Sequence, residues 1–558
     1  MQKVRIDESC DSFWKIRTSH AYYVDKTEML HRYLTENFKA AVLFARPRRF
    51  GKTITMTMFR DFLDIRQKSD DIFAGTKIME HPQTVAAYMN QFPVVFLSLK
   101  EIHGDSYDNT LANLRIQAAN ICKDLETDLQ QGSINPYDWN LFSALADQKA
   151  DESNTIAFLD LLTRMLFARY QRPAFVLIDE YDVPMAKAAG TADYDKVRDM
   201  VEHMLSYVCK TNEHVKAVLL SGCLYTVKNS TYTGVNNIIP YTVLSPNYAA
   251  DIGFTDADVQ KLLSDADLQD HYETVQEWYD GYLFGRERMY CPWDVLRYVS
   301  AVQDGSYSEA MGPESYWVNT SETSLEVVHG FLGKTPGVME SFEQLLAGKS
   351  IDCVVNDSLP YHLIYEKGEN IWSALLETGY LTKALPERMA RMPLRIPNRG
   401  IQDVFRQEVW DYFQDKVENA FVRDLVNTLW AGEAQQAEAA LNQILEATLS
   451  FYHEYHEYSY HLILDGFFTG FGYQVLSEQE AGYGRSDLIV LDPARERALI
   501  LELKHVTAEE KMAQALSEAT SQIIRQKYES NATYHGYTTR LKYAIVCHQK
   551  KASVAFIA

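Results

Sequence analysis

The sequence lacks several features that would define its class at once. It has no uninterrupted run of about 18 apolar residues, so we expect no membrane-spanning helix. Residues 1–8 contain no apolar core of the signal-peptide kind, and we expect a cytoplasmic protein. The seven cysteines form no C-x-x-C pair, which argues against a zinc site and a disulfide framework. We also find no internal repeat and no low-complexity tract.

Positive charge is in short supply. The 54 Lys and Arg residues stand against 76 Asp and Glu residues, which gives a formal net charge of −22. Because binding along a nucleic-acid backbone needs a concentrated basic surface, this balance disfavours loose adhesion to nucleic acid. Any DNA contact must therefore be local, and metal ions could bridge it. The 558 residues have room for roughly three or four domains, and the 46% hydrophobic content is typical of globular proteins.

One stretch predicts a phosphate-binding loop. The apolar run Ala41-Val42-Leu43 leads into Phe44-Ala45-Arg46-Pro47-Arg48-Arg49-Phe50-Gly51-Lys52-Thr53. In such a loop, backbone N–H groups at a helix N-terminus bind the anion, the Lys reaches the outer phosphates and the Thr hydroxyl holds Mg²⁺. In the pattern G-x-x-x-x-G-K-[ST], however, the first Gly would fall at position 46, where this chain has Arg. The nucleotide-binding candidates in the loop are Arg49, Gly51, Lys52 and Thr53.

Further apolar strands are expected at residues 92–99, 174–178 and 216–222. The second of them ends in Asp179-Glu180-Tyr181-Asp182, the second half of an ATPase signature, in which Asp179 orders Mg²⁺ and Glu180 polarises the attacking water. The structural alternative is a buried parallel strand capped by Asp at a helix start. The Gly-Lys-Thr in the same chain favours the ATPase interpretation. Ser221, at the end of the last strand, could sense the outer phosphate.

The order of elements predicts the domains. Strands separated by helices imply right-handed crossovers and a parallel sheet with its ligand at the strand carboxyl ends, so we expect a nucleotide-binding α/β domain at 1–245. Residues 246–400 are predicted to be a helical lid and linker region. Within it, 278–285 is interpreted as a packed turn of a small helical bundle, and a lid over the nucleotide is the functional alternative. The segment 392–400, with its Pro, Arg and Gly residues, indicates the boundary before a last domain at 401–558.

The last domain is expected to run helix, strand, strand, strand, helix, strand, with helices at about 436–468 and 508–528 and a closing strand at 541–547. Because side chains alternate across a strand, Glu502 and Lys504 should emerge on the same face. Two such charges are costly to bury without partners. Asp487 and Glu502 could ligate Mg²⁺ while Lys504 orients or activates a water. The alternative is a surface strand with an ordinary Glu-Lys pair.

The neighbouring helices add weaker candidates. Glu457, with Tyr460 and His461, precedes the sheet and could add a carboxylate to the metal region. Gln522 and Tyr528 follow it, and the Gln could position substrate or water. Taken singly, such residues belong more often to a surface or a satisfied core. Their order around the Asp, Glu and Lys set is what indicates a site.

These motifs together resemble a bacterial AAA-ATPase-like family fused to a carboxyl-terminal PD-(D/E)XK nuclease-superfamily domain. The family's own phosphate loop also has Arg in place of the first Gly. The resemblance implies a P-loop, AAA-like parallel sheet flanked by helices, a helical middle region and a PD-(D/E)XK-type α/β domain. The matching stretches are 46–53, 23–27, 177–182, 234–237, 278–282 and 484–487.

Two segments depart from the family. Gly222-Cys223-Leu224-Tyr225 lacks the basic residue expected soon after this strand, although Lys228 is nearby, and Cys291 stands where the family usually has Asn. These two departures leave the details of the sensor and of the lid undetermined. Neither departure changes Lys52, Asp179 or the Asp487, Glu502 and Lys504 set.

The leading hypothesis is an ATP-binding and ATP-hydrolysing protein with a metal-dependent nuclease domain that cleaves DNA, with Mg²⁺ or Mn²⁺ at the nuclease site. The alternative is a nucleotide-switched regulator that binds DNA or protein without cutting, which the acidic charge favours slightly. Relatives of the AAA class often work as rings, so the sequence is compatible with a homo-oligomer. It does not identify an arginine finger. The catalytic candidates are Glu180, Asp487, Glu502, Lys504 and Gln522; the metal ligands are Thr53, Asp179, Asp487, Glu502 and Glu457; Ser221 completes the nucleotide-binding set.

Overall fold

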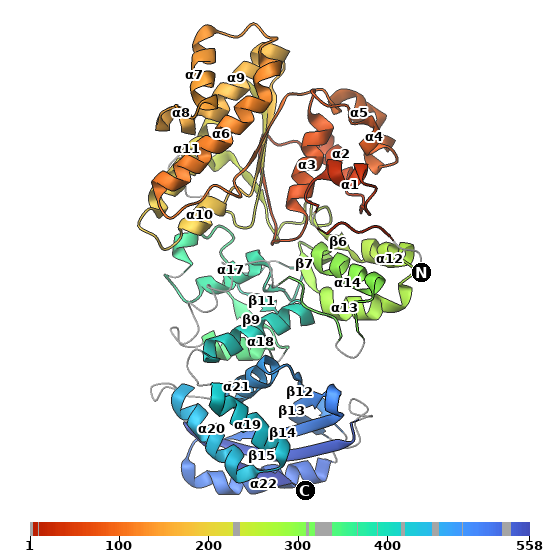
Figure 1. The fold of residues 1–558 in the computed structure, drawn as a ribbon, viewed down its shortest axis with the longest axis vertical. Coiled ribbons are helices and arrows are strands. Elements are labelled where there is room, and N and C mark those ends of the chain that lie inside the picture. The colour runs from red at the N-terminus through yellow and green to blue at the C-terminus, as the bar shows by residue number, and fades with distance from the viewer. Residues whose placement is uncertain are drawn as a thin grey trace. The chain divides into compact units, whose positions relative to one another are not determined.

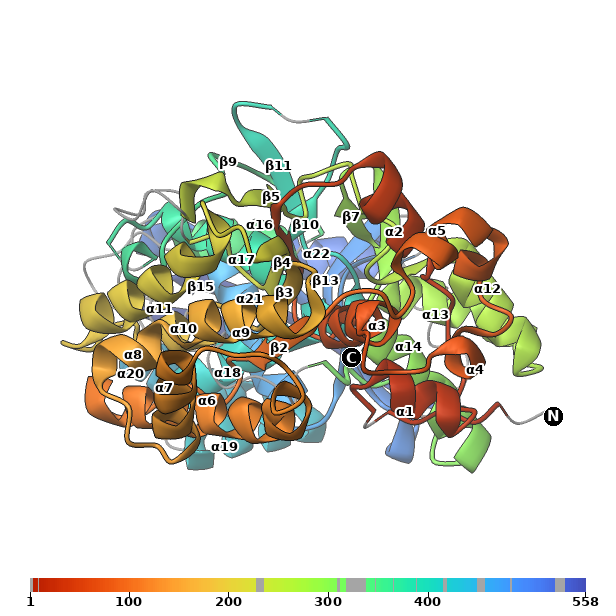
Figure 2. The same cartoon turned by 90° about the horizontal axis from the view of Figure 1, so that it is seen from above.

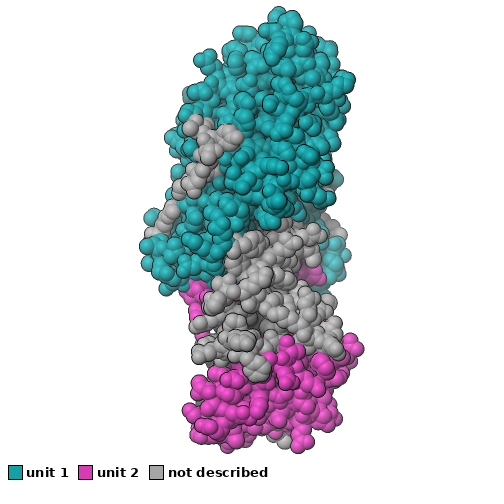
Figure 3. All heavy atoms as spheres, turned by 90° about the vertical axis from the view of Figure 1, so that its left-hand side faces the viewer, with its two compact units in different colours: residues 1–308, 352–399 teal, residues 309–351, 400–558 magenta. Residues whose placement is uncertain are grey.

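The chain forms two compact units in a computed structural model (Figure 1). Unit 1 comprises Met1–Ser308 and Asp352–Arg399, and unit 2 comprises Glu309–Ile351 and Gly400–Ala558; Figure 3 colours them teal and magenta. Among the described residues, no helix is long and apolar enough to cross a membrane. The structure describes residues 4–8, 10–226, 235–308, 312–317, 338–346, 348–364, 366–387, 389–414, 419–448, 457–481, 484–526 and 537–557.

A parallel five-stranded sheet in the order β2-β3-β4-β1-β5 forms the core of unit 1. Every residue of β1 and β3 is buried, as expected for strands covered on both faces. The register pairs Ala45 with Gly222 and Ser98 with Asp179, so the carboxyl ends of these strands lie at one edge. The predicted α/β class and parallel sheet are confirmed. The strands are β1 (Ala41–Ala45), β2 (Val94–Ser98), β3 (Ala174–Asp179), β4 (Val215–Gly222) and β5 (Ile239–Tyr241).

Helices cover both faces of this sheet (Figures 1 and 2). Helix α3 (Lys52–Leu63) packs on one face, with α1, α2, η1, α4, η2 and α5 beside it, while α6, α9 and α11 supply apolar side chains to the other. Helices α8 and α9 are separated by Ala157 alone. The bounds are α1 (Phe13–Thr18), α2 (Glu28–His31), η1 (Arg32–Glu36), α4 (Asp70–Phe73), η2 (Lys77–Glu80), α5 (Pro82–Tyr88), α6 (Tyr107–Leu129), α7 (Pro136–Ala146), α8 (Glu152–Ile156), α9 (Phe158–Tyr170), α10 (Val183–Ala188), α11 (Tyr194–Cys209) and η3 (Val235–Asn237).

The middle of the chain is helical, as predicted, and also carries a small antiparallel sheet, β6-β8-β7. The segment interpreted as a packed turn contains a strand, Tyr282–Phe284. The chain reverses at Gly285, and this strand pairs antiparallel with the one that follows. Gly281 has φ of 111°, and a Cβ there would lie 2.0 Å from the carbonyl oxygen of Pro397, so only glycine fits. The elements are β6 (Phe254–Thr255), α12 (Asp256–Asp265), η4 (Gln269–His271), α13 (Tyr272–Tyr279), β7 (Tyr282–Phe284), β8 (Glu287–Tyr290) and α14 (Pro292–Asp304).

Residues 352–399, which we call the return segment, bring the chain back to unit 1. The segment contains the short helix η6, helix α17 and strands β10 and β11, which pair antiparallel. Strand β9 completes their three-stranded sheet. The bounds are β9 (Ile351–Cys353), η6 (Tyr361–Leu363), α17 (Asn370–Thr378), β10 (Thr382–Lys383) and β11 (Met392–Arg395).

Unit 2 is built on a mixed five-stranded sheet in the order β12-β13-β14-β15-β16. Strands β14 and β15 are parallel and the other neighbours antiparallel; β16 was not expected from the sequence. The helix expected at 436–468 is described as α20 and α21, and residues 449–456 lie outside the described residues. The elements are α16 (Val338–Leu346), α18 (Arg399–Gln414), α19 (Asn419–Ala431), α20 (Ala434–Thr448), α21 (Glu457–Gly470), β12 (Gln474–Ala481), β13 (Gly484–Asp492), η7 (Pro493–Arg495), β14 (Arg497–His505), η8 (Glu509–Lys511), α22 (Met512–Gln526), β15 (Thr539–His548) and β16 (Lys551–Ile557).

Candidate nucleotide and nuclease sites

The predicted phosphate loop connects β1 to α3. Gly51 has φ of 91° and directly precedes Lys52, the first residue of α3. A Cβ at Gly51 would meet nothing within 4 Å, so the glycine is required by the left-handed backbone and not by space. The first N–H groups of an α-helix have no partner within the helix and carry its positive dipole end. This terminus therefore fits an anionic phosphate group.

Lys52 points back into its own loop. Its Nζ donates to the carbonyl oxygens of Arg46 at 3.0 Å and Pro47 at 2.9 Å. It also lies 3.7 Å from Sγ of Cys223, in one of the two segments that depart from the family pattern. The side chain is buried at 7% exposure. An ammonium held by backbone carbonyls at a helix N-terminus is suitably placed to exchange them for phosphate oxygens.

Three predicted side chains meet at the carboxyl edge of the parallel sheet. Thr53 Oγ1 donates to Asp179 Oδ2 at 2.7 Å, and the Ser221 hydroxyl donates to Asp179 Oδ1. The backbone N–H of Glu180 in turn donates to Ser221 Oγ at 3.3 Å. A hydroxyl and a carboxylate in contact are the hard oxygen donors that Mg²⁺ prefers beside nucleotide phosphates. The residues present therefore fit the predicted metal.

Glu180 occupies a left-handed backbone conformation with φ of 53°. This conformation costs about 1–3 kcal/mol for a residue other than glycine, and such strain concentrates at functional sites. Burial raises the pKa of the Glu180 carboxyl, and the nearby Asp179 charge raises it further, while Lys52 opposes the shift. The Glu180 carboxyl is thus close enough to Asp179 and to Lys52 for both charges to shift its pKa.

Arg46, which stands where the pattern has glycine, is completely buried. Its guanidinium donates to the carbonyl oxygens of Ala45, Tyr241 and Tyr248 at 2.7 to 2.8 Å and lies 5.4 Å from the centre of the Phe284 ring. Burial lowers the pKa of Arg46 to about 10, so the side chain stays charged at neutral pH. Arg46 therefore joins the phosphate loop to β5 and the turn after it.

The other loop residues pack against the middle region. The Arg49 guanidinium lies 4.2 Å from the centre of the Trp293 ring, a cation–π contact with the first turn of α14. Phe50 meets Tyr282 of β7 edge to face, with ring centres 5.1 Å apart. Cys291, the second unusual cysteine, donates weakly to the Arg49 carbonyl oxygen at 3.8 Å. The predicted nucleotide ligand Arg49 is thus stacked on Trp293 in this structure.

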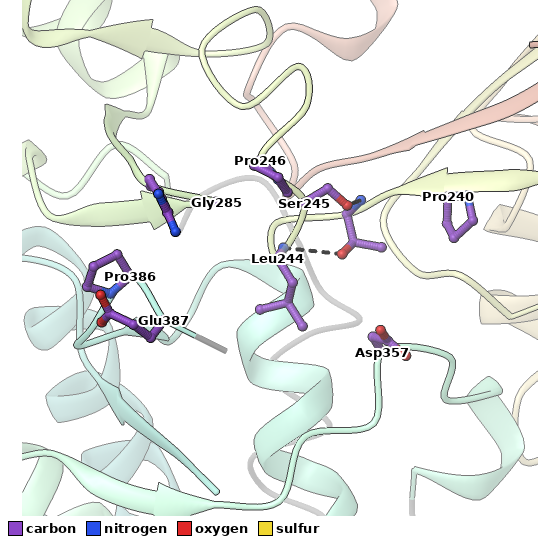
Figure 4. Close-up of a pocket in the computed structure, with 10 residues that line it drawn as sticks. Pro240, Leu244, Ser245, Pro246, Gly285, Asp357, Pro386 and Glu387 are labelled. Carbon is purple, nitrogen blue, oxygen red and sulfur yellow. Dashed lines mark hydrogen bonds between the residues drawn. The ribbon is translucent and has the colours of Figure 1, made fainter. Parts of the chain in front are cut away.

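A cavity of about 420 Å³ lies elsewhere in unit 1 (Figure 4). It is bounded by the turn after β5, the β7–β8 turn and the return segment. None of the predicted nucleotide-binding residues is among its lining residues. The lining residues are Pro240, Thr242, Leu244, Ser245, Pro246, Gly285, Arg286, Asp357, Pro386 and Glu387.

In unit 2, Glu502 and Lys504 lie on one face of β14, as predicted. Glu502 is completely buried, and Lys504 Nζ lies 3.1 Å from its Oε1. Alternation places these two residues after Ala498 and Ile500, whose side chains share a core with α22. Because a buried carboxylate is costly without a partner, the Lys504 ammonium compensates part of the charge. This arrangement differs from the exposed Glu-Lys pair of the alternative.

The other nuclease candidates are placed less completely. Asp487 lies in β13 immediately before Leu488, which pairs with Leu501, so its backbone is next to that of Glu502; its side chain lies outside the described residues. The Glu457 side chain, Lys228 and Tyr528 lie outside them too. Gln522 is partly buried on α22, beside the core residue Ile523.

His461 on α21 does approach the candidate nuclease site. Burial and then the charge of Lys504 lower its pKa to about 4, so the imidazole is neutral at physiological pH. The structure therefore brings Glu502, Lys504 and His461 together.

Comparison with known proteins defines two classes of domain in the chain. Residues 9–232 match the family described as "Predicted AAA-ATPase", and residues 455–556 match the PD-(D/E)XK nuclease superfamily. These two matches confirm the resemblance: the chain contains an AAA-ATPase-like domain and a PD-(D/E)XK nuclease-superfamily domain. A protein of Azotobacter chroococcum mcd 1, described as "Uncharacterized protein in vnfD 5'region", is 24% identical over 409 residues, covering 72% of this chain and 69% of that protein.

One group of contacts at the candidate nucleotide site was not predicted from the sequence. Asp182 Oδ2 accepts from the backbone N–H groups of Cys223 and Leu224, both at 2.9 Å, and from the Tyr361 hydroxyl at 2.9 Å. The second carboxylate after β3 was a visible signal for Asp182. Tyr361 lies 179 residues further along the chain and has no local signal at all.

Proposed function

We propose that this protein binds and hydrolyses ATP with Mg²⁺ in unit 1 and cleaves phosphodiester bonds of DNA in unit 2, with Mg²⁺ or Mn²⁺. The observation that carries the ATPase half is the 2.7 Å hydrogen bond from Thr53 to Asp179. It joins the two halves of the ATPase signature, which are 126 residues apart in the chain. The family match at 9–232 supports the same half.

In this proposal each residue of the ATP site has a role. The N-terminus of α3 and Lys52 bind the phosphates, Thr53 and Asp179 orient the metal, and Glu180 orients the attacking water. Ser221 holds the Asp179 carboxylate and contacts the Glu180 backbone. A bound divalent ion would offset the negative charge that develops on the phosphates.

The nuclease half rests on the completely buried Glu502 and its contact with Lys504. In the proposed site, Asp487 and Glu502 provide oxygen ligands, and Lys504 orients a water or holds its proton. His461, neutral because of burial and of Lys504, adds a group that can accept a hydrogen bond beside it.

The test is purified protein incubated with plasmid DNA and Mg²⁺ or Mn²⁺, with and without ATP. We expect cleavage by the wild type and its loss in Asp487→Ala and Lys504→Ala. ATP turnover should be lost in Lys52→Ala. Absence of cleavage by the wild type with either metal, or cleavage that survives both nuclease-site substitutions, would refute the nuclease half. ATP turnover unaffected by Lys52→Ala would refute the ATPase half.

A second function is favoured by the net charge of −22. An acidic protein that uses ATP as a switch and binds DNA or another protein without cutting would show ATP-dependent retention of its partner with no cleavage product. The same plasmid assay, read both as a mobility shift and as cleavage, distinguishes this regulator from the nuclease.

A further inference from the structure

The return segment contacts the candidate nucleotide site through Tyr361. The Tyr361 hydroxyl donates to Asp182 Oδ2 at 2.9 Å, and the same oxygen accepts two backbone N–H groups of the turn after β4. Asp182 is buried at 2% exposure. Burial, followed by the charge of Asp182, raises the pKa of Tyr361 well above its usual value, so its hydroxyl keeps the proton that it donates. Three donors thus fix one carboxylate oxygen in the turn that also contains Glu180.

A second contact lies at the phosphate loop itself. Gly379, the left-handed residue that ends α17, lies so close to the loop that a Cβ there would be 2.7 Å from Pro47 Cβ. The Pro47 carbonyl oxygen is one of the two that hold Lys52 Nζ. The return segment therefore contacts both halves of the ATPase signature.

Further hydrogen bonds join the segment to the small antiparallel sheet. The Thr382 hydroxyl accepts from the backbone N–H of Leu283 at 2.8 Å, and Lys383 Nζ donates to the Gly285 carbonyl oxygen at 2.6 Å. Lys383 is buried at 3% exposure. Asp357, which precedes η6, and Pro386 and Glu387, which follow β10, line the cavity of Figure 4. The segment is thus held at defined points and also borders the cavity.

The return segment lies between two parts of unit 2 in the sequence. The part of unit 2 at Glu309–Ile351 directly precedes the return segment, and the rest of unit 2 follows it from Gly400. The backbone therefore connects the return segment directly to unit 2 at both of its ends.

We infer that Tyr361 is a positioning residue for ATP hydrolysis and that the return segment passes the state of the nucleotide site to unit 2, an inference that rests on the function proposed above. Glu180 and Asp182 belong to the same short turn, with only Tyr181 between them. A movement of Glu180 towards the nucleotide must move Asp182, and with it the Tyr361 hydroxyl. Because interfaces of this kind have discrete packed arrangements, such a movement selects one position of the segment over another.

The experiment compares the full-length wild type with Tyr361→Phe, which removes only the donated hydrogen bond. Tyr170→Phe is the matched control, because the Tyr170 hydroxyl also donates to an aspartate, Asp128, between α9 and α6. We measure the ATP dissociation constant, kcat and KM for ATP, the melting temperature, and DNA cleavage with and without ATP. For Tyr361→Phe we expect kcat to fall about tenfold, the size of effect typical for a hydrogen bond to a charged group. The ATP dissociation constant should stay within about twofold, and the ratio of cleavage rates with and without ATP should approach one.

The outcomes separate the inference from the proposed function. A wild type that turns over ATP together with an unchanged kcat in Tyr361→Phe would overturn the inference alone. An equal loss of kcat in Tyr170→Phe would reduce the effect to general structure and overturn it too. A wild type without ATP turnover would overturn the proposed function and the inference with it. Hydrogen exchange gives a readout independent of activity: residues 370–383 should exchange more slowly when a non-hydrolysable ATP analogue binds, and unchanged exchange would contradict the coupling.

Discussion

The Nζ atom of Lys52 lies 3.0 Å from the carbonyl oxygen of Arg46, the residue that replaces the first glycine of the phosphate-loop pattern. The backbone and the side chain of Arg46 have different roles in this loop. The Arg46 backbone holds the lysine, while its guanidinium satisfies three carbonyl oxygens inside the protein. Because the whole side chain is buried, the arginine is a structural element of the loop and not a ligand on its surface.

Restoring the glycine should therefore damage the protein. Arg46→Gly leaves the carbonyl oxygens of Tyr241 and Tyr248 without their donor and opens a cavity, so we expect a loss of about 3 kcal/mol or more of unfolding free energy. Thermal and denaturant unfolding measure this change. Arg49→Ala is the control, since it removes only a cation–π contact at an exposed arginine and should cost about 1 kcal/mol or less. A stable Arg46→Gly variant would contradict this account of the loop.

From the contact between Thr53 and Asp179 we predict how ATP hydrolysis depends on the Mg²⁺ concentration. Thr53→Ala removes the hydroxyl that lies on Asp179, so we expect the Mg²⁺ concentration for half-maximal ATP hydrolysis to rise about 10- to 100-fold. Thr53→Ser keeps the hydroxyl and should restore most of the affinity. The measurement is a Mg²⁺ titration of the hydrolysis rate at fixed ATP. Thr55→Ala, one turn into the same helix, loses only a bond to the Gly51 carbonyl oxygen and should leave the titration within about twofold.

The sequence predicted those parts of the fold that depend on local patterns. The strands at 41–45 and 174–179 are continuous apolar runs with polar residues at their ends, so their type, burial and common edge could all be derived. The common face of Glu502 and Lys504 followed from alternation alone, and the structure adds the 3.1 Å contact between them. The roles of Arg46 and Tyr361 could not be derived, because their partners lie 195 and 179 residues away in the chain and no periodicity encodes such contacts. Strand β7 was missed since three residues between glycines are too short for a pattern to show.

The neutral imidazole of His461 predicts a pH dependence of stability. Its pKa is about 4 in the folded protein, below the ordinary value of 6.5, so the unfolded chain takes up a proton first as the pH falls. Stability contributed by the neutral ring is complete above about pH 6.5 and is lost progressively from there towards pH 4. The unfolding free energy of His461→Gln should therefore fall less steeply with decreasing pH than that of the wild type, by up to about 1.4 kcal/mol per pH unit. Hydrogen exchange of α21 between pH 7 and pH 5 in both proteins measures the difference, in which the titration of all shared carboxylates cancels.

The buried pair in β14 should separate stability from activity. Glu502→Gln removes a completely buried charge and leaves Lys504, whose side chain is 31% exposed, able to reach water, so we expect little change in unfolding free energy. On the proposed function, cleavage should nevertheless fall about 100-fold or more, because the substitution removes the proposed carboxylate ligand. Lys504→Ala removes the cation beside the buried Glu502 carboxylate, so we expect the unfolding free energy to fall by about 2 to 3 kcal/mol.

The control for this pair is the same kind of ion pair on the surface. Lys551 and Glu509 lie 2.6 Å apart with side chains 62% and 60% exposed, so Lys551→Ala should cost less than about 1 kcal/mol and leave cleavage unchanged. Denaturant unfolding and plasmid cleavage are measured on all four proteins. If Glu502→Gln and Lys504→Ala destabilise unit 2 equally, the burial of Glu502 serves the fold. If only Lys504→Ala does so while both abolish cleavage, the protein keeps a costly buried carboxylate for its chemistry.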